Sequence, residues 1–165
     1  MIVVSDTTPL NYLVLVNAVD VLPKLLKKVY TPHEVVRELA DARAPQQVRQ
    51  WAQDPPDWLM VATPSSRLAS TDQLDPGEAN AISLAKEIKA PAVLLDEKRG
   101  RIVAQSEGLV VIRTLALLEL AAERQLLELR PILELLQATS FRIDRKLIDS
   151  SLARDAARKR ARPGG

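Results

Sequence analysis

Blocks of apolar residues alternate with amphipathic stretches along most of the chain. Apolar runs at residues 2–5 and 92–95 are typical of strands that are buried on both faces of a parallel sheet. Residues 29–30, 58–62 and 109–112 predict further strands. Because the strands alternate with helical segments, we expect an α/β fold: a three-layer sandwich with a central parallel sheet flanked by helices, in a Rossmann-like topology.

The clearest signal for the start of a helix is at Pro76, which begins a helix predicted over residues 76–89. Asp75 can cap this helix, Pro76 takes its first position, and Glu78 follows in the first turn. Thr31-Pro32-His33-Glu34 has the form of a capping box, which predicts a second helix with Thr31 as its N-cap. Apolar residues at helical spacing predict the remaining helices, within residues 7–14, 21–26, 41–54, 97–107, 115–121, 132–136 and 144–160.

The 165 residues fit one domain, which we expect to span residues 1–150, followed by a basic tail at 151–165. Residues 142–162 contain eight basic and three acidic residues, although the whole chain carries a net charge of only +2. A basic segment on a mildly acidic body suits a protein that approaches a polyanion. A solvated helix end would have the same composition, so both interpretations stay open.

The composition of the chain indicates the cellular compartment in which the protein works. The chain has no cysteine, which excludes disulfides and thiolate metal sites. It has no apolar run near the roughly 20 residues of a membrane span. No basic segment precedes the first strand, so we expect no signal peptide. These features predict a cytoplasmic protein that does not enter a membrane.

Four carboxylates occupy positions that a parallel sheet could bring together. Asp6 and Asp96 follow strands, while Glu38 and Glu78 lie in helices expected to pack on the sheet. Each alone is explained as a helix cap or a solvated residue. As a set they would repel one another unless a divalent cation joined them. With no cysteine and a single histidine, such an oxygen-only site indicates Mg²⁺ or Mn²⁺, which suits metal-assisted hydrolysis of a phosphodiester.

Four stretches of the chain resemble PIN domains, and more specifically their DUF3368 branch. They are residues 4–11 (VSDTTPLN), 35–39 (VVREL), 74–82 (LDPGEANAI) and 94–101 (LLDEKRGR). Members of this branch often belong to toxin–antitoxin pairs. The resemblance implies a VapC-like toxin, that is, a Mg²⁺- or Mn²⁺-dependent endoribonuclease that cleaves single-stranded RNA. Its catalytic and metal-binding acids would be Asp6, Glu38, Glu78 and Asp96.

The resemblance also indicates residues around these acids. Thr7 and Asn11 would orient Asp6 or the substrate phosphate. Arg99 and Arg101 could hold an RNA phosphate, or be solvated. Related sequences usually carry Gly-Thr-x-Gly after the last strand, where this chain has Arg113 and Thr114 followed by Leu115-Ala116. Arg113 could therefore bind substrate, crowd the pocket or pair with an acid.

The main alternative is an interaction module of the same fold, with weak or no catalysis, that docks a protein partner in its acidic pocket. In either case the resemblance implies a cognate antitoxin as partner. A haloacid dehalogenase-type phosphatase needs an Asp where Thr8 stands, and is rejected. The leucine-rich helices at 115–121 and 132–136 suggest a homodimer, or they simply cap the sheet.

Overall fold

The structure is a computed structural model that describes residues 1–164. The chain divides into two compact units, Met1–Thr114 and a helical unit that begins at Leu115. The boundary expected at residue 150 falls inside helix α9 (Arg145–Ala161). Each unit is described by itself.

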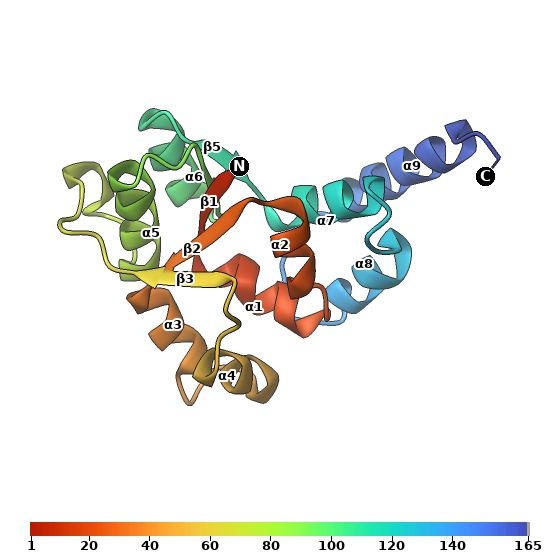
Figure 1. Ribbon diagram of the computed structural model, residues 1–165. Coiled ribbons are helices and arrows are strands. Elements are labelled where there is room, and N and C mark those ends of the chain that lie inside the picture. Colours follow the sequence, from red (N-terminus) through yellow and green to blue (C-terminus); the bar gives the residue numbers. More distant parts are fainter. Residues whose placement is uncertain (165) are drawn as a thin grey trace. The chain divides into compact units, whose positions relative to one another are not determined.

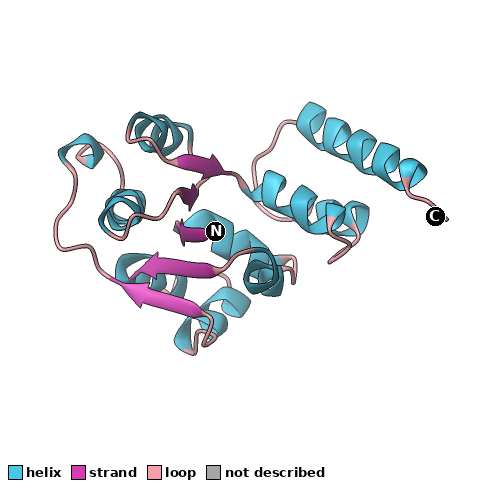
Figure 2. Cartoon of the chain, turned by 45° about the horizontal axis from the view of Figure 1, so that its top comes forward, coloured by secondary structure: helices cyan, strands magenta, loops and turns pink. Residues whose placement is uncertain are grey.

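A five-stranded sheet forms the centre of the first unit (Figure 2). All paired strands run parallel, in the order β3-β2-β1-β4-β5. The expected parallel α/β sheet is therefore confirmed. The strands are β1 (Ile2–Ser5), β2 (Lys28–Pro32), β3 (Leu59–Ala62), β4 (Ala92–Leu94) and β5 (Val110–Ile112).

Strand β1 lies at the point where the strand order reverses. Its residue Val4 pairs with Tyr30 of β2 on one side and with Val93 of β4 on the other. The chain first proceeds from β1 to β2 and β3, then returns to β1 to add β4 and β5. Open α/β sheets bind ligands at the carboxyl ends of the strands beside such a reversal.

The helices of the first unit connect these strands, as Figure 1 shows. Two short 3₁₀ turns, at Val19–Val21 and Ala69–Thr71, accompany them. The α-helices are α1 (Thr7–Leu15), α2 (Leu22–Leu25), α3 (His33–Ala40), α4 (Gln46–Gln53), α5 (Pro76–Glu87) and α6 (Lys98–Ser106).

Helices α5 and α6 cover one face of the sheet. Val4 and Val93 point to this face and join a buried cluster with Ile82 and Leu84 of α5 and Ala104 of α6. Helix α2 lies against β2, and α3 lies against β2 and β3. From β1 to β3 the chain moves in one direction along the sheet, and from β3 to β4 and β5 it moves in the opposite direction. Because connections between parallel strands are right-handed, α2 and α3 lie on the face opposite to α5 and α6. The result is the expected three-layer sandwich.

The capping box expected at Thr31 is wrong. Strand β2 continues through Pro32, which is itself the N-cap of α3 and makes no side-chain cap. The hydroxyl of Thr31 instead donates a hydrogen bond of 2.8 Å to the backbone carbonyl of Ser5 on β1. The cap expected at Asp75 is confirmed, since its Oδ1 accepts a hydrogen bond of 2.9 Å from the amide of Glu78.

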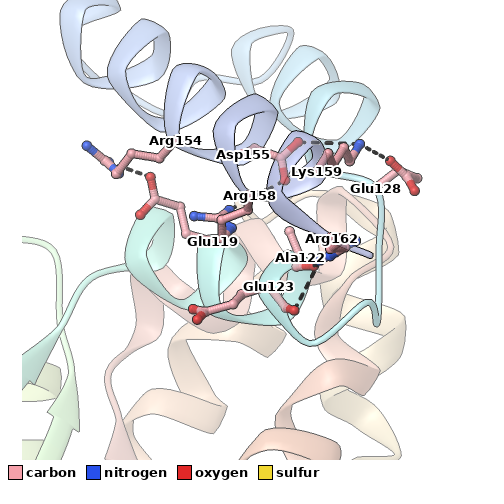
Figure 3. A network of polar contacts seen from close by, with 9 residues as sticks. All are labelled: Glu119, Ala122, Glu123, Glu128, Arg154, Asp155, Arg158, Lys159 and Arg162. Atoms are coloured by element: carbon pink, nitrogen blue, oxygen red, sulfur yellow. Dashed lines mark hydrogen bonds and ion pairs between the residues drawn. The ribbon is translucent and has the colours of Figure 1, made fainter. Parts of the chain in front are cut away.

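The second unit consists of α7 (Thr114–Glu123), α8 (Leu129–Gln137) and α9. The segment expected to be a basic tail is helical as far as Ala161, and ion pairs tie it to the other helices (Figure 3). Arg154 pairs with Glu119, and Lys159 pairs with Glu128 and with Asp155. Part of its positive charge is therefore already neutralised.

Within residues 1–164, none of the helices combines the length and the apolar character that crossing a membrane requires.

Candidate active site

A cavity of about 380 Å³ opens where the sheet reverses its strand order. It collects residues from the end of β1, from α3, from the start of α5 and from the segment after β4. Most of its polar groups are carboxylates. The lining residues are Asp6, Thr7, Thr8, Glu38, Gln73, Leu74, Asp75, Glu78, Glu97 and Arg99.

Asp6 lies at the back of this cavity. It follows β1, and its amide donates a hydrogen bond of 3.0 Å to Leu94 of β4, which fixes it at the reversal point. Asp6 is only 3% exposed, and its Oδ1 has no hydrogen-bond partner among the described residues. Burial raises the pKa of Asp6 well above its usual value, and the charges of Asp75, Glu78 and Glu38 raise it further, against a lowering hydrogen bond from the Thr7 backbone.

Glu38 enters the cavity from α3. Its Oε2 accepts a hydrogen bond from the hydroxyl of Thr7, and a hydrogen bond with the Gly77 backbone also stabilises its charged form. Burial outweighs these bonds, so the pKa of Glu38 is raised. A Cβ at position 77 would stand 2.8 Å from Oε1 of Glu38. Glycine at this position therefore lets the Glu38 carboxylate lie against the start of α5, and any larger residue would push the carboxylate aside.

Glu78 completes the central group from the first turn of α5. It is 5% exposed, and its Oε1 lacks a hydrogen-bond partner within residues 1–164. Burial, followed by the neighbouring Asp75 carboxylate, raises the pKa of Glu78 to about 7. A Cβ at Gly100 would stand 3.3 Å from this same oxygen, so a second glycine leaves room for the acid.

Asp96 is held differently from the other three acids. Its Oδ1 accepts a hydrogen bond of 2.9 Å from the Thr114 amide, and its Oδ2 accepts one from the Thr114 hydroxyl. Burial raises the pKa of Asp96, while these hydrogen bonds and then the charges of Arg113 and Arg101 lower it. Arg101 also donates a hydrogen bond of 3.0 Å from Nε to the Asp96 carbonyl.

The structure thus gathers three of the four expected acids, Asp6, Glu38 and Glu78, around one cavity. Asp96 leaves the strand beside Asp6, but it is not among the residues that line the cavity. Of the expected neighbours, Thr7 and Arg99 line the cavity. Arg101, Arg113 and Thr114 surround Asp96, and Asn11 is half-buried in α1 outside the cavity lining.

Two further acids were missed by sequence reasoning. Asp75 had been interpreted only as a helix cap, but its charge also raises the pKa of Asp6, Glu38 and Glu78. Glu97 lines the cavity where Asp96 was expected. The signal for Glu97 was its place directly after Asp96, because consecutive residues leaving a strand point in different directions.

The chemistry of the lining residues, rather than their arrangement, suits a hard divalent cation. In the described part of the chain, no three His, Cys, Asp or Glu side chains form a ready-made metal cluster. Two buried carboxylate oxygens, Oδ1 of Asp6 and Oε1 of Glu78, nevertheless lack a hydrogen-bond donor there. Carboxylates at one cavity, with neither cysteine nor histidine in its lining, are the ligands that Mg²⁺ and Mn²⁺ prefer.

The carboxylates thus lie at the reversal point of a parallel α/β sheet, which is where open α/β folds bind their ligands. The DUF3368 family model, a PIN domain, matches residues 2–156, and the chain belongs to this family. PIN domains are generally nucleases, so the family match supports a nuclease-like fold. Comparison with curated proteins and with solved structures gave no match.

Proposed function

We propose that this protein is a Mg²⁺- or Mn²⁺-dependent endoribonuclease that cleaves single-stranded RNA, and that it acts as the toxin of a toxin–antitoxin pair. The observation that carries the proposal is the pair of buried oxygens without hydrogen-bond donors, on Asp6 and Glu78, at one acidic cavity. Leaving such groups without a partner costs stability. A cation at the cavity would offset that cost.

Asp6, Glu38 and Glu78 would hold the cation, and Asp96 would support it from its place beside Thr114. A bound divalent cation supplies Lewis-acid stabilisation of the scissile phosphate and activates the attacking water. The pKa of Glu78, raised to about 7, means that this acid holds a proton for part of the time at neutral pH in the cation-free pocket, so that binding the cation would release it.

Arg99 would hold the substrate. It is an exposed arginine among the lining residues, and no acid within residues 1–164 forms a salt bridge with it. A guanidinium in this position can donate two hydrogen bonds to a phosphate. Thr7 keeps Glu38 directed at the pocket through its hydroxyl. In this assignment the acids hold the reacting centre and Arg99 positions the RNA backbone.

The toxin role and the antitoxin are part of this proposal and rest on the family. A homodimer and a cytoplasmic location are also part of it, and they rest on the leucine-rich helices and on the composition of the chain. PIN-domain membership supports an RNA substrate, and the acidic pocket offers a place where a basic side chain of an antitoxin could bind. Such a partner would compete with the cation for the same oxygens.

The test is cleavage of a labelled single-stranded RNA by the purified protein with Mg²⁺ or Mn²⁺. EDTA and the variant Asp6→Asn serve as controls, because the variant keeps the size of the side chain while removing its charge. We expect cleavage that depends on the cation and falls at least about 100-fold in the variant. Cleavage that persists in EDTA, or at full rate in Asp6→Asn, would contradict the proposal.

One observation favours the alternative of an interaction module. Both carboxylate oxygens of Asp96 already accept hydrogen bonds from Thr114, and the charge of Arg113 lies close enough to lower its pKa. An acid satisfied in this way gains less from a cation. Calorimetric titration with Mn²⁺ separates the two functions, because an interaction module would show neither cation binding nor cleavage.

A further inference from the structure

A second, smaller cavity of about 250 Å³ adjoins the acidic one. It is lined by Glu38, Asp41, Arg43 and Ala44, at the end of α3 and the turn that follows. Glu38 lines both cavities. The two cavities therefore meet at this side chain.

Arg43 is exposed, yet its guanidinium is fixed in place. Nε donates a hydrogen bond of 2.9 Å to Oδ1 of Asp41, and NH2 donates one of 3.3 Å to Oδ2. The backbone amide of Arg43 also donates to Oδ1 at 2.9 Å. These bonds lower the pKa of Asp41 to about 2, so the pair stays ionised at neutral pH. The Arg43 side chain remains 92% exposed.

The held guanidinium suits a flat ligand better than an anion. Asp41 already occupies one edge of the donor fork and neutralises its charge. A phosphate or a protein carboxylate would have to compete with Asp41, whereas a nucleobase stacks on the planar face and needs no free donor. Splayed bases of single-stranded RNA stack on arginine planes in this way.

The chain topology places Arg43 and Arg99 on different sides of Asp6. Arg43 lies in the connection that follows β2, and Arg99 lies in α6, which follows β4. Strands β2 and β4 flank β1 on its two sides, and Asp6 ends β1. An RNA strand in contact with both arginines would thus cross the carboxyl edge of the sheet over the acidic cavity.

We propose that the cavity at Arg43 is a nucleotide subsite, in which the base next to the scissile phosphate stacks on the guanidinium held by Asp41. The inference rests on the proposed ribonuclease function and adds where the substrate runs beyond the reacting phosphate. Recognition is of single-stranded RNA, because only an unstacked base can present its face to Arg43.

Charge-matched variants test the subsite. The double variant Asp41→Ala/Arg43→Ala removes the subsite pair, and Glu34→Ala/Arg37→Ala removes a comparable exposed pair on α3 that lines neither cavity. Both double variants leave the net charge unchanged. Binding of a fluorescein-labelled hexaribonucleotide would be measured by anisotropy in Ca²⁺ and in EDTA, for the intact oligomer and for oligomers with one abasic position each.

We expect the Asp41/Arg43 variant to weaken binding about tenfold, and the Glu34/Arg37 variant to change it less than twofold. One abasic position should weaken binding to the wild type by a similar factor and have no effect on the Asp41/Arg43 variant. Three outcomes would overturn the subsite. The two double variants could bind RNA with equal affinity, all abasic positions could have equal effects, or the wild type could fail to bind RNA.

Failure of the subsite and failure of the ribonuclease proposal are distinguishable. Cation-dependent cleavage by a wild type whose binding is insensitive to Asp41 and Arg43 would remove the subsite and leave the nuclease. Abasic-sensitive binding through Arg43 without any cleavage would keep the subsite and remove the nuclease. A third outcome would assign the cavity to a protein partner instead. In that case an acidic peptide would bind the wild type tenfold better than the Asp41/Arg43 variant, while RNA would bind both proteins equally.

Discussion

The acidic cavity of the first unit and the charged helices of the second use ionised side chains in opposite ways. In the cavity, like charges lie together and two buried oxygens, on Asp6 and Glu78, lack donors within residues 1–164. In the second unit, opposite charges are paired, as in Asp155 with Arg158 and with Lys159. The second arrangement stabilises itself, whereas the first leaves carboxylate oxygens without a partner in the described part of the chain.

The pKa values express the same difference. Burial and repulsion raise the pKa of Glu78 to about 7, which favours its uncharged form. The hydrogen bond from Lys159 to Glu128 raises the pKa of Lys159, which favours its charged form. A carboxylate cluster that destabilises its own charges is typical of a functional site, and a paired network is typical of structural support.

The largest expected effect comes from filling the space beside Glu38. Alanine normally stabilises a helix relative to glycine, by up to about 1 kcal/mol. In Gly77→Ala, however, the new Cβ would meet Glu38 Oε1 at 2.8 Å and displace the flexible carboxylate. We expect kcat/KM for RNA to fall about 100-fold while the melting temperature is kept. In the double variant with Glu38→Gln the two losses should not add, and full additivity would contradict this role of Gly77.

A second prediction concerns the paired region. Asp155→Ala removes a buried carboxylate and leaves Arg158, whose Nε is buried without a partner in the described chain, with no counter-charge. We expect a loss of about 2 kcal/mol in the free energy of unfolding, measured with urea. Arg154→Ala breaks a more exposed pair with Glu119 and should cost less than about 1 kcal/mol. Equal losses would remove the distinction between buried and exposed pairs.

Substitutions at Thr114 test whether the hydrogen bond that this residue donates to Asp96 contributes to activity. Thr114→Val keeps the shape and removes the hydroxyl that donates to Asp96. If Asp96 supports the cation, kcat should fall about tenfold and Mn²⁺ affinity should fall with it. Thr114→Ser restores the donor and should restore both. Loss of activity in the serine variant as well would indicate a packing role for Thr114.

The last prediction concerns the pH dependence of stability. An acid whose pKa is raised in the folded state binds more protons there than in the unfolded chain, so stability falls as pH rises from the ordinary value of 4.5 through about 7. The cation-free protein should thus melt at a higher temperature at pH 5.5 than at pH 8. Glu78→Gln should reduce this difference, and saturating Mn²⁺ should reduce it in the wild type. An identical pH profile for Glu78→Gln would show that Glu78 is not the titrating group.

The sequence predicted those features that depend on local signals. Apolar runs are sufficient to locate β1 and β4, because a strand covered on both faces needs no polar alternation. The Asp75-Pro76 start of α5 is equally local, since the cap acts on the amide of Glu78 three residues later. Together with the motif spacing, these signals predicted that Asp6 and Glu78 come close together, and both line the acidic cavity.

What the sequence could not predict depends on partners far along the chain. Thr31 has the local form of a cap, but the Ser5 carbonyl of a neighbouring strand takes its hydroxyl. Asp96 follows its strand as expected, yet Thr114 holds its carboxylate, so that Glu97 lines the cavity. The hydrogen-bond partners of Thr31 and Asp96 depend on which groups the fold brings close to them. The local residue pattern does not contain this information.

The reversed strand order also has a consequence during synthesis. Strand β1 leaves the ribosome first, but its neighbour β4 begins only at Ala92, and the cavity wall needs Glu97 and Arg99 as well. At roughly 5–20 residues per second, translation reaches these residues several seconds after Asp6. A nascent chain therefore carries no assembled pocket for most of its elongation. A truncated product that ends before β4 would lack the pocket, and a ligand that recognises the finished pocket would find it only on chains that extend beyond Arg99.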